Sequence, residues 1–410
     1  MAEVKPEVET FAKIKVAGVG GSGGNAITRM IECKLTGVDF VAINTDAQDL
    51  HACAAGEKIH IGKNLTRGLG AGMNPELGRQ AAEENRDEIQ EAFKGCDMVF
   101  VVYGAGGGTG SGAGPVVAEA AREAGALTVG VATKPFTFEG KQRMVIAEES
   151  LENLKDRVDT SITVQNDKLL QIVDRQTSLL NAFRIVDDVL RQGVQGISDL
   201  ITKPGIINVD FADIKSVIQD SGSALMGVGV ASGEDRAQKA AKQAISSPLL
   251  DVSVDGAKGV LFNITGGVDL TMMEINEAAG LITENIDPNA RIIFGAASDE
   301  TVKKDEIKIT VVATGFDNDG ISQGDFSKDL NLEEDSLEDE DGFKKSKVSS
   351  FMDDDFDNEE DSANNFGKDN KFKSDESKMS GGSFGPEENP LDDLDDDIEI
   401  PAFIRKKMGK

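Results

Sequence analysis

Two glycine-rich loops are the segments whose composition points most directly to chemistry. The first, residues 18–25, contains a G-x-G-x-x-G pattern directly after a predicted strand and before a predicted helix. Glycines let a backbone approach phosphate closely, and the first turn of a helix attracts anions through its free amides. Taken alone, this loop fits a dinucleotide-binding domain, or a turn with a purely structural role.

The second loop is richer in glycine, which makes up seven of the eleven residues from 104 to 114. Each glycine costs folding entropy, so the run is better explained as a backbone cradle for an anion than as a choice for stability. Thr109 and Ser111 add hydroxyl donors, and no G-x-x-x-x-G-K-[ST] pattern of a P-loop occurs. Two glycine loops at strand ends, facing one crevice, suit a nucleoside triphosphate.

The surrounding pattern predicts the elements that must position these loops. Short β-branched runs alternate with helical stretches, which indicates a parallel α/β sheet with strands at 14–19, 38–43, 98–103 and 127–132. A long amphipathic pattern predicts a helix over 178–201, stopped by Pro204 and Gly205. A smaller α+β unit follows, with strands at 223–231, 259–264, 291–296 and 306–313 and helices at 236–245 and 271–282.

Charge and composition restrict the function further. The formal net charge of -30 argues against a nucleic-acid-binding surface, which needs a basic patch. Residues 317–399 carry 29 acidic side chains against eight lysines, without periodicity, and we expect a disordered linker up to about residue 391. Three cysteines without paired spacing predict reduced thiols in the cytoplasm, and no apolar run is long enough to span a bilayer.

The motifs then show a specific resemblance, which runs from about residue 13 to residue 316. The run Gly106–Gly112 reads G-G-G-T-G-S-G and resembles the signature of the tubulin/FtsZ family of GTPases. Further matching segments are N-T-D at 44–46, G-A-G-M-N-P at 70–75, K-P-F at 134–136 and N-V-D-F-A-D at 208–213. The peptide I-P-A-F-I-R at 400–405 resembles the adaptor-binding motif of the FtsZ branch, which functions in bacterial cell division. Ser22, Tyr103 and Ala105 depart from the usual family residues.

The resemblance implies a domain plan. It comprises an N-terminal arm (1–12), a Rossmann-like GTP-binding domain (13–177), a central helix (178–202), and a C-terminal α+β domain with the catalytic loop (203–316). A disordered acidic linker (317–391) and an adaptor-binding peptide (392–410) follow. The implied fold class is α/β.

The resemblance also assigns roles to single residues. Phosphate and sugar would be lined by the two glycine loops and their neighbours: Gly21, Ser22, Gly23, Gly24, Asn25, Asn44, Gly72, Gly108, Thr109 and Gly110. Glu139 and Arg143 would meet ribose and phosphate, although their spacing also fits a solvated i,i+4 helix pair. Phe183 would stack on guanine, and Asp187 would accept hydrogen bonds from its N1 and exocyclic amine, selecting guanine over adenine. Phe183 fits an ordinary core position as well.

The candidate catalytic residues are Asn208, Asp210 and Asp213, although residues 208–213 alone fit a helix N-cap with an acidic first turn. A helix of about 24 residues, about 36 Å long, separates them from the glycine loops. The family arrangement therefore implies that they polarise water for the GTP of the next subunit in a head-to-tail filament. Mg²⁺ would bind through the nucleotide phosphates, with no dedicated protein ligands.

Two alternatives stay open at this point. The first glycine loop alone fits a nicotinamide dehydrogenase, which a comparison of GTP with NAD binding would detect. A tubulin-like regulator that binds GTP without forming division filaments is the second. For the favoured function we expect GTP and GDP as ligands, the chain itself as polymer partner, and adaptor and regulatory proteins on residues 398–407. We expect no nucleic acid, no direct membrane anchor, and a cytoplasmic location concentrated at mid-cell.

Overall fold

The computed structural model describes residues 12–169, 177–203, 205–247, 256–284, 286–299, 302–303 and 305–316. The predicted arm, apart from residue 12, and the predicted linker and adaptor peptide lie outside these residues. The described part forms one ten-stranded sheet in the order β3-β2-β1-β4-β5-β6-β7-β10-β8-β9. The mixed α/β class predicted from the sequence is confirmed.

The first six strands are parallel; the alternating pattern predicted a parallel sheet and four of these strands, but not β3 and β6. They are β1 (Ile14–Val19), β2 (Asp39–Asn44), β3 (Glu57–His60), β4 (Met98–Gly104), β5 (Leu127–Lys134) and β6 (Thr160–Gln165). The helices connecting them are α1 (Gly20–Glu32), α2 (Ala47–Ala52), α3 (Lys63–Thr66), α4 (Pro75–Glu84), α5 (Arg86–Phe93), α6 (Gly108–Glu123), η1 (Thr137–Glu139), α7 (Lys141–Lys155) and α8 (Asn166–Leu169).

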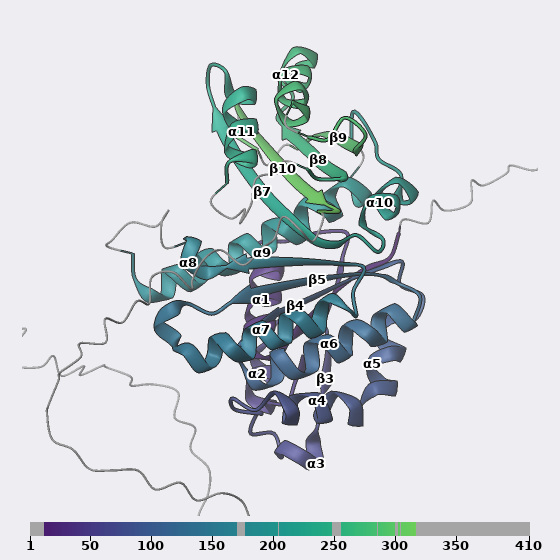
Figure 1. Cartoon of the computed structure of the whole chain (residues 1–410), viewed down its shortest axis with the longest axis vertical. Coiled ribbons are helices and arrows are strands. Elements are labelled where there is room, and N and C mark those ends of the chain that lie inside the picture. The colour runs from purple at the N-terminus through teal and green to yellow at the C-terminus, as the bar shows by residue number, and fades with distance from the viewer. Residues whose placement is uncertain are drawn as a thin grey trace, which may run out of the picture. The chain divides into compact units, whose positions relative to one another are not determined.

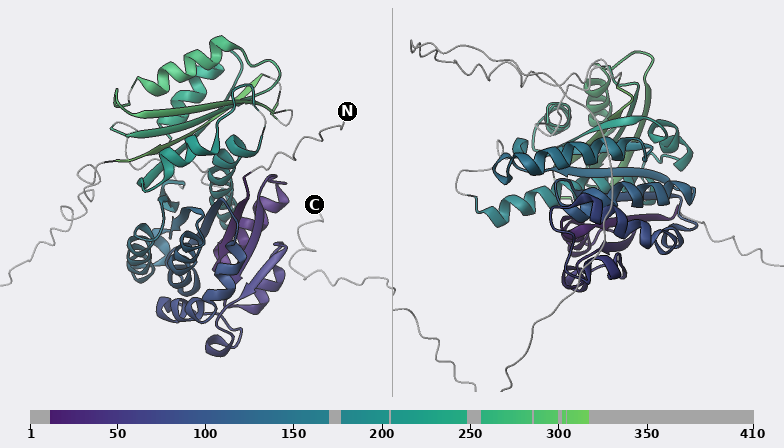
Figure 2. Two further views of the ribbon diagram at one scale, coloured as in Figure 1. Left: turned by 90° about the vertical axis from the view of Figure 1, so that its right-hand side faces the viewer. Right: turned by 60° about the horizontal axis from the view of Figure 1, so that its bottom comes forward.

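Successive strand residues point to opposite faces of the sheet, and both faces are buried. Val16, Phe100 and Val129 belong to a core shared with α1 and with α9 (Leu179–Thr202). Ala17, Val99 and their neighbours belong to a second core, shared with α4, α5, α6 and α7. Figure 1 and Figure 2 show helices on both sides of these strands. This double covering explains why the central strand β4 is a continuous apolar run in the sequence.

The C-terminal half continues the same sheet. β7 (Gly222–Ser232) pairs parallel with β6 over only three rungs, Thr160–Gly222, Ser161–Ser223 and Ile162–Ala224. β10 (Glu306–Thr314) lies antiparallel between β7 and β8 (Gly259–Gly266), and β9 (Arg291–Ser298) pairs parallel with β8. The helices here are α10 (Phe211–Ile218), α11 (Arg236–Ile245) and α12 (Met272–Thr283), the last two packed over a third core.

Several predicted boundaries shift by one or two residues, and one shifts more. The sequence pattern predicts the first helix over residues 25–32, but the helix starts at Gly20. Four glycines precede Asn25, and glycine propensity argues against a helix. Buried positions at Gly20, Gly23, Ala26, Ile27 and Met30 follow helical spacing, so packing on the sheet outweighs propensity.

Candidate functional site

Two helix N-termini meet at the carboxyl edge of the neighbouring strands β1 and β4. α1 begins directly after β1, and α6 begins at Gly108, four residues after β4. Neither helix has a side-chain cap, because the N-cap residues are Val19 and Gly107. A Cβ added to Gly20 would lie 3.0 Å from the amide nitrogen of Gly110, so the two ends are in close contact. Two converging sets of helix amides make an anion site, which we call the cradle.

The glycines of the second loop divide into two groups. A Cβ on Gly107 would meet nothing within 4 Å, which places this position beside open space. A Cβ on Gly112 would lie 1.9 Å from the carbonyl oxygen of Pro75, and one on Gly114 would lie 2.8 Å from the ring of Tyr103. Helix α4 packs here from its own small residue, Gly78, whose Cβ would lie 2.3 Å from the Gly108 carbonyl oxygen. The expectation that the whole run serves an anion is therefore too broad.

The loops after β2 and before α4 close one side of the cradle. Gly72 has a φ of +58° and faces open space, and its carbonyl oxygen accepts a 2.8 Å hydrogen bond from the Gly108 amide. The hydroxyls of Thr45 and Thr109 lie 2.6 Å apart. Asn44 is buried, and its Oδ1 accepts from the Asp46 amide at 3.2 Å. The structure thus brings Asn44, Gly72, Gly108 and Thr109 together, with the Gly108 amide already engaged by protein.

A cavity of about 90 Å³ opens beside the first glycine loop. It shares Gly21, Gly24, Asn25 and Asn44 with the predicted site. Its remaining lining comes from β1, α1, β2 and α2: Gly18, Gly20, Thr28, Ala42, Ile43, Asp49, Leu50, Ala52 and Cys53. Gly23 is absent from this wall because it packs inward, where a Cβ would lie 2.4 Å from the Val102 carbonyl oxygen. Ser22 approaches Gly104 instead, since a Cβ on Gly104 would lie 2.6 Å from the Ser22 hydroxyl oxygen.

Glu139 and Arg143 form an ion pair at 2.6 Å, but not on one helix. Glu139 ends η1, Gly140 interrupts with a φ of +103°, and α7 starts at Lys141. The second oxygen of Glu139 accepts the Phe136 amide at 2.9 Å. The alternative of a solvated pair along one helix is therefore wrong, because the pair spans a chain turn and braces it.

Phe183 and Asp187 lie one turn apart near the start of α9. Phe183 is 40% exposed and meets the ring of Phe136 edge-on, with centroids 5.6 Å apart. This exposure excludes the ordinary core position. Burial raises the pKa of Asp187 to about 6, partly offset by the nearby charge of Arg29. A flat, accessible ring beside a partly buried carboxylate is suited to a planar base that carries N–H donors.

Sequence reasoning missed Asn166, which lies where β6 runs into α8. Its side chain is buried, and its Oδ1 has no hydrogen-bond partner within the described part of the chain. A buried acceptor without a partner costs free energy unless something donates to it. An asparagine directly after a strand, at the same sheet edge as the glycine loops, is the signal that could have found it.

The candidate catalytic residues follow the C-terminal end of α9, just before α10 and within its first turn; Figure 1 labels both helices. Asp210 is the N-cap of α10, accepting the Ala212 amide at 3.4 Å, and Asp213 lies in its first turn. Asn208 accepts the Gly205 amide at 2.6 Å. All three are exposed, and the 24 residues of α9 extend about 36 Å between them and the cradle. We call residues 208–213 the carboxylate loop.

Metal-binding clusters and membrane spans are both absent from the described ranges. These ranges hold no cluster of three or more histidine, cysteine or acidic side chains arranged to bind a metal ion. None of their helices combines the length and apolarity needed to cross a bilayer.

Comparison with known proteins agrees with the geometry. Residues 13–174 match the Tubulin/FtsZ family, GTPase domain, and residues 222–317 match the FtsZ family, C-terminal domain. A solved structure of an FtsZ dimer from M. jannaschii is 49% identical, with a TM-score of 0.72, covering 75% of this chain and 89% of that chain. A GTPγS-bound protofilament of CetZ2 from Haloferax volcanii shares the fold at 23% identity and a TM-score of 0.65, covering 75% and 94%.

The two matched domains follow one another in the order that the fold shows, on either side of α9. The high identity extends across nearly the whole of the M. jannaschii protein. With a GTPase domain and the FtsZ C-terminal domain in one sheet, this chain belongs to the FtsZ family of GTP-dependent, filament-forming, tubulin-like cytoskeletal proteins.

Proposed function

We propose that this chain forms the cell-division ring, and that GTP held by one subunit is hydrolysed with the carboxylate loop of the next. The observation that supports this best is the separation of the two half-sites. The cradle and the carboxylate loop lie at opposite ends of a 24-residue helix, so one chain cannot bring both to one nucleotide. A head-to-tail contact joins them and repeats as an open filament.

The cradle half would bind GTP with the residues that family resemblance assigns. The amides of Thr109 and Gly110, and the loops at Gly21 and Gly72, would contact phosphate. Phe183 would stack on guanine, with Asp187 accepting from its N1 and exocyclic amine. Asn166 would add an acceptor there. Mg²⁺, held mainly by the phosphates, would neutralise charge developing on the leaving oxygens.

In the carboxylate loop, Asp210 and Asp213 would orient and polarise the attacking water, with Asn208 holding the loop. Asp210 also caps α10, so its carboxylate direction is set by the helix. Exposed carboxylates suit this role because the neighbouring subunit's nucleotide must reach them. Assembly would thereby activate hydrolysis.

Exposed apolar side chains at both ends support a head-to-tail contact. Beside the cradle, Leu69 is 83% exposed and Met73 is also exposed. Beside the carboxylate loop, Ile206 is 61% exposed. Full burial of an exposed side chain of this size in a contact would contribute about 1.5–3 kcal/mol.

A mixing experiment tests the shared site directly. Asp213→Ala keeps an intact cradle, and Asp187→Asn keeps an intact carboxylate loop. Each variant alone should hydrolyse GTP slowly. An equal mixture should regain activity, because up to about a quarter of the random junctions pair one intact cradle with one intact loop. A mixture no more active than the mean of its components would refute the shared site.

Residues 398–407 would bind membrane adaptor and regulatory division proteins, and the chain would work in the cytoplasm at the mid-cell division site. Residues 1–12 would form an N-terminal arm, 13–177 the GTP-binding domain, 178–202 the central helix, 203–316 the C-terminal domain, 317–391 a linker and 392–410 the adaptor-binding peptide.

A further inference from the structure

The segment between β8 and α12 carries an unusual concentration of exposed apolar surface. Val268 is 92% exposed, Met272 is 72% exposed and Met273 is 67% exposed. We call residues 267–273 the apolar segment. Methionine and valine at such exposure gain nothing in an isolated chain, and a cluster of them marks a surface that another molecule covers.

The apolar segment is tied to the carboxylate loop through neighbouring backbone. The Asp299 amide donates to the Gly266 carbonyl oxygen at 2.9 Å, and Asp299 pairs with Lys203 at 2.8 Å. Lys203 ends α9, directly before the loop that carries Ile206 and Asn208. Ile207 bridges to Ala296 on β9. The backbones that carry the two exposed stretches are therefore linked directly, through Asp299 and β9.

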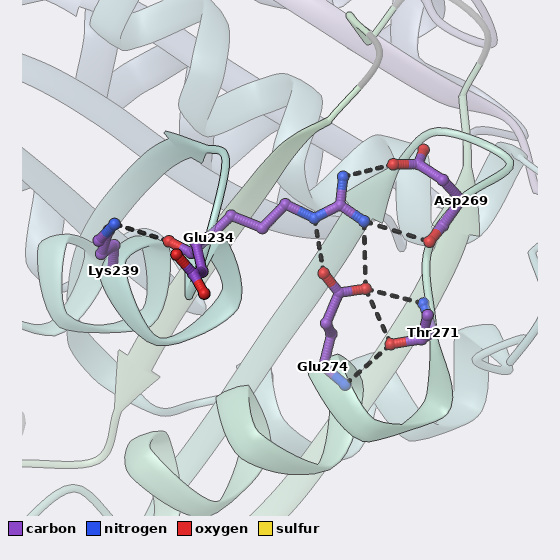
Figure 3. Close-up of polar contacts among 6 residues, drawn as sticks. Glu234, Lys239, Asp269, Thr271 and Glu274 are labelled. Atoms are coloured by element: carbon purple, nitrogen blue, oxygen red, sulfur yellow. Dashed lines mark hydrogen bonds and ion pairs between the residues drawn. The ribbon is translucent and has the colours of Figure 1, made fainter.

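A buried guanidinium, that of Arg236, forms hydrogen bonds to this segment and to the helix that follows it. Arg236, the first residue of α11, is only 6% exposed. Its Nη1 donates to Asp269 Oδ2 at 2.5 Å and its Nη2 to the Asp269 carbonyl oxygen at 3.2 Å. Its Nε and Nη2 donate to the two carboxylate oxygens of Glu274, at 2.6 and 3.1 Å. Figure 3 shows the hydrogen bonds from this group to both Asp269 and Glu274.

We call the hydrogen bonds of Arg236 to Asp269 and Glu274 the clamp. Glu274 also connects the clamp to the start of α12. Its Oε2 also accepts the amide and the hydroxyl of Thr271, both at 2.9 Å, while the Thr271 hydroxyl accepts the Glu274 amide at 3.3 Å (Figure 3). Hydrogen bonds from Arg236 lower the pKa of both Glu274 and Asp269, so both are ionised at neutral pH. These polar contacts fix the backbone on both sides of the apolar side chains.

We propose that Arg236 is a positioning residue for assembly: it preorganises the apolar segment to dock on the cradle end of a second copy of this chain. The inference rests on the proposed function. Val268, Met272 and Met273 would meet the exposed Leu69 and Met73 of that copy. Fixing a docking segment before contact removes the ordering cost from association, so filaments form at lower concentration.

Arg236 touches neither the cradle nor the carboxylate loop, which gives a distinctive signature. GTPase rate plotted against protein concentration yields an intercept, the critical concentration, and a slope, the turnover per assembled subunit. Arg236→Ala should raise the intercept about tenfold and leave the slope within about twofold. GTP affinity of dilute protein should be unchanged, because the nucleotide lies in the other half of the sheet.

Matched variants separate positioning from general stability. Arg236→Lys should give a smaller rise, because an ammonium retains charge but cannot pair bidentately with Glu274. Asp269→Asn, which leaves the Glu274 pair intact, should also give a partial rise. Lys239→Ala removes an exposed cation from the same helix and should change nothing, since its Nζ binds the Glu234 carbonyl oxygen outside the clamp (Figure 3).

Hydrogen exchange measures directly whether Arg236 orders the apolar segment. Amides of residues 267–274 should exchange faster in Arg236→Ala while those of β8 and β10 stay protected. An unchanged critical concentration despite faster exchange would overturn the inference, as would a loss of slope. If Arg236→Ala does not fold, Arg236→Lys and Asp269→Asn decide by the same criteria. If the wild-type activity per molecule is independent of protein concentration, the proposed function fails instead.

Discussion

The pKa of Asp187 makes GTP affinity depend on pH in a defined direction. This carboxyl titrates at about 6, compared with 3.8 for a free aspartate, because burial disfavours its charge. Only the ionised form can accept both the N1 and the exocyclic N–H of guanine. Affinity should therefore fall as the pH falls through 6, because protonation competes with the base.

The size of the effect follows from the titration curve. About nine-tenths of Asp187 is ionised at pH 7 and about one-tenth at pH 5, so the Kd should rise about tenfold, or about 1.4 kcal/mol. Stability should move the opposite way. In the nucleotide-free protein, this raised pKa makes the folded state bind the proton more readily, so its contribution to the free energy of unfolding grows as the pH falls from about 6 towards 3.8.

Calorimetric titration with GDP, which avoids turnover, measures this effect at pH values from 5 to 8. The terminal phosphate titrates in the same range, so the comparison must be with Asp187→Asn, which shares that phosphate. The wild-type Kd should rise about tenfold more than the variant Kd. Parallel curves for the two proteins would show that Asp187 does not bind the base. A variant with full wild-type affinity at pH 7 would show the same.

Three further predictions use other parts of the structure. Gly112→Ala should destabilise folding by about 2 kcal/mol or more by overpacking against Pro75, whereas Gly107→Ala should leave the unfolding free energy within about 0.5 kcal/mol but weaken GTP binding; equal unfolding midpoints would contradict this division. Asp213→Ala should bind GTP normally and pellet as polymer but lose turnover about 100-fold; normal hydrolysis would remove it from the mechanism. Deleting residues 398–410 should leave polymerisation intact and abolish adaptor binding in a pull-down, and unchanged capture would refute the docking role.

The sequence predicted the strands well where their residues are mostly apolar. β4 is an unbroken apolar run that ends in glycine, and β1 and β5 are mostly apolar runs interrupted by Lys15 and Thr128, so the limits of all three were found within two residues. β6 was missed because Thr160, Ser161 and Thr163 read as loop, although the first two are buried in the sheet. Because β6 was not predicted, the continuity of the sheet was not predicted either, since it depends on the pairing of β6 with β7.

Some features of the site were likewise predictable from the sequence, and others were not. Loop composition predicted a phosphate cradle, because glycine density is visible in the sequence. Which glycines face open space was not predictable, because Gly107 and Gly112 differ only in what approaches them from α4. The clamp of Arg236 on Asp269 and Glu274 could not be predicted either, since nothing local links positions more than 30 residues apart. Long-range ion pairs leave no periodic pattern.

The short pairing between β6 and β7, only three residues on each strand, has a consequence for synthesis of the chain. When residue 165 has left the ribosome, the first six strands can pair, but β6 presents an open edge until residues 222–224 follow. At about 5–20 residues per second this interval is several seconds. An unpaired edge recruits foreign strands, so nascent chains are most prone to mispairing during this interval. Slowing translation while residues 166–224 emerge from the ribosome should therefore increase aggregation more than slowing it after residue 232 has emerged.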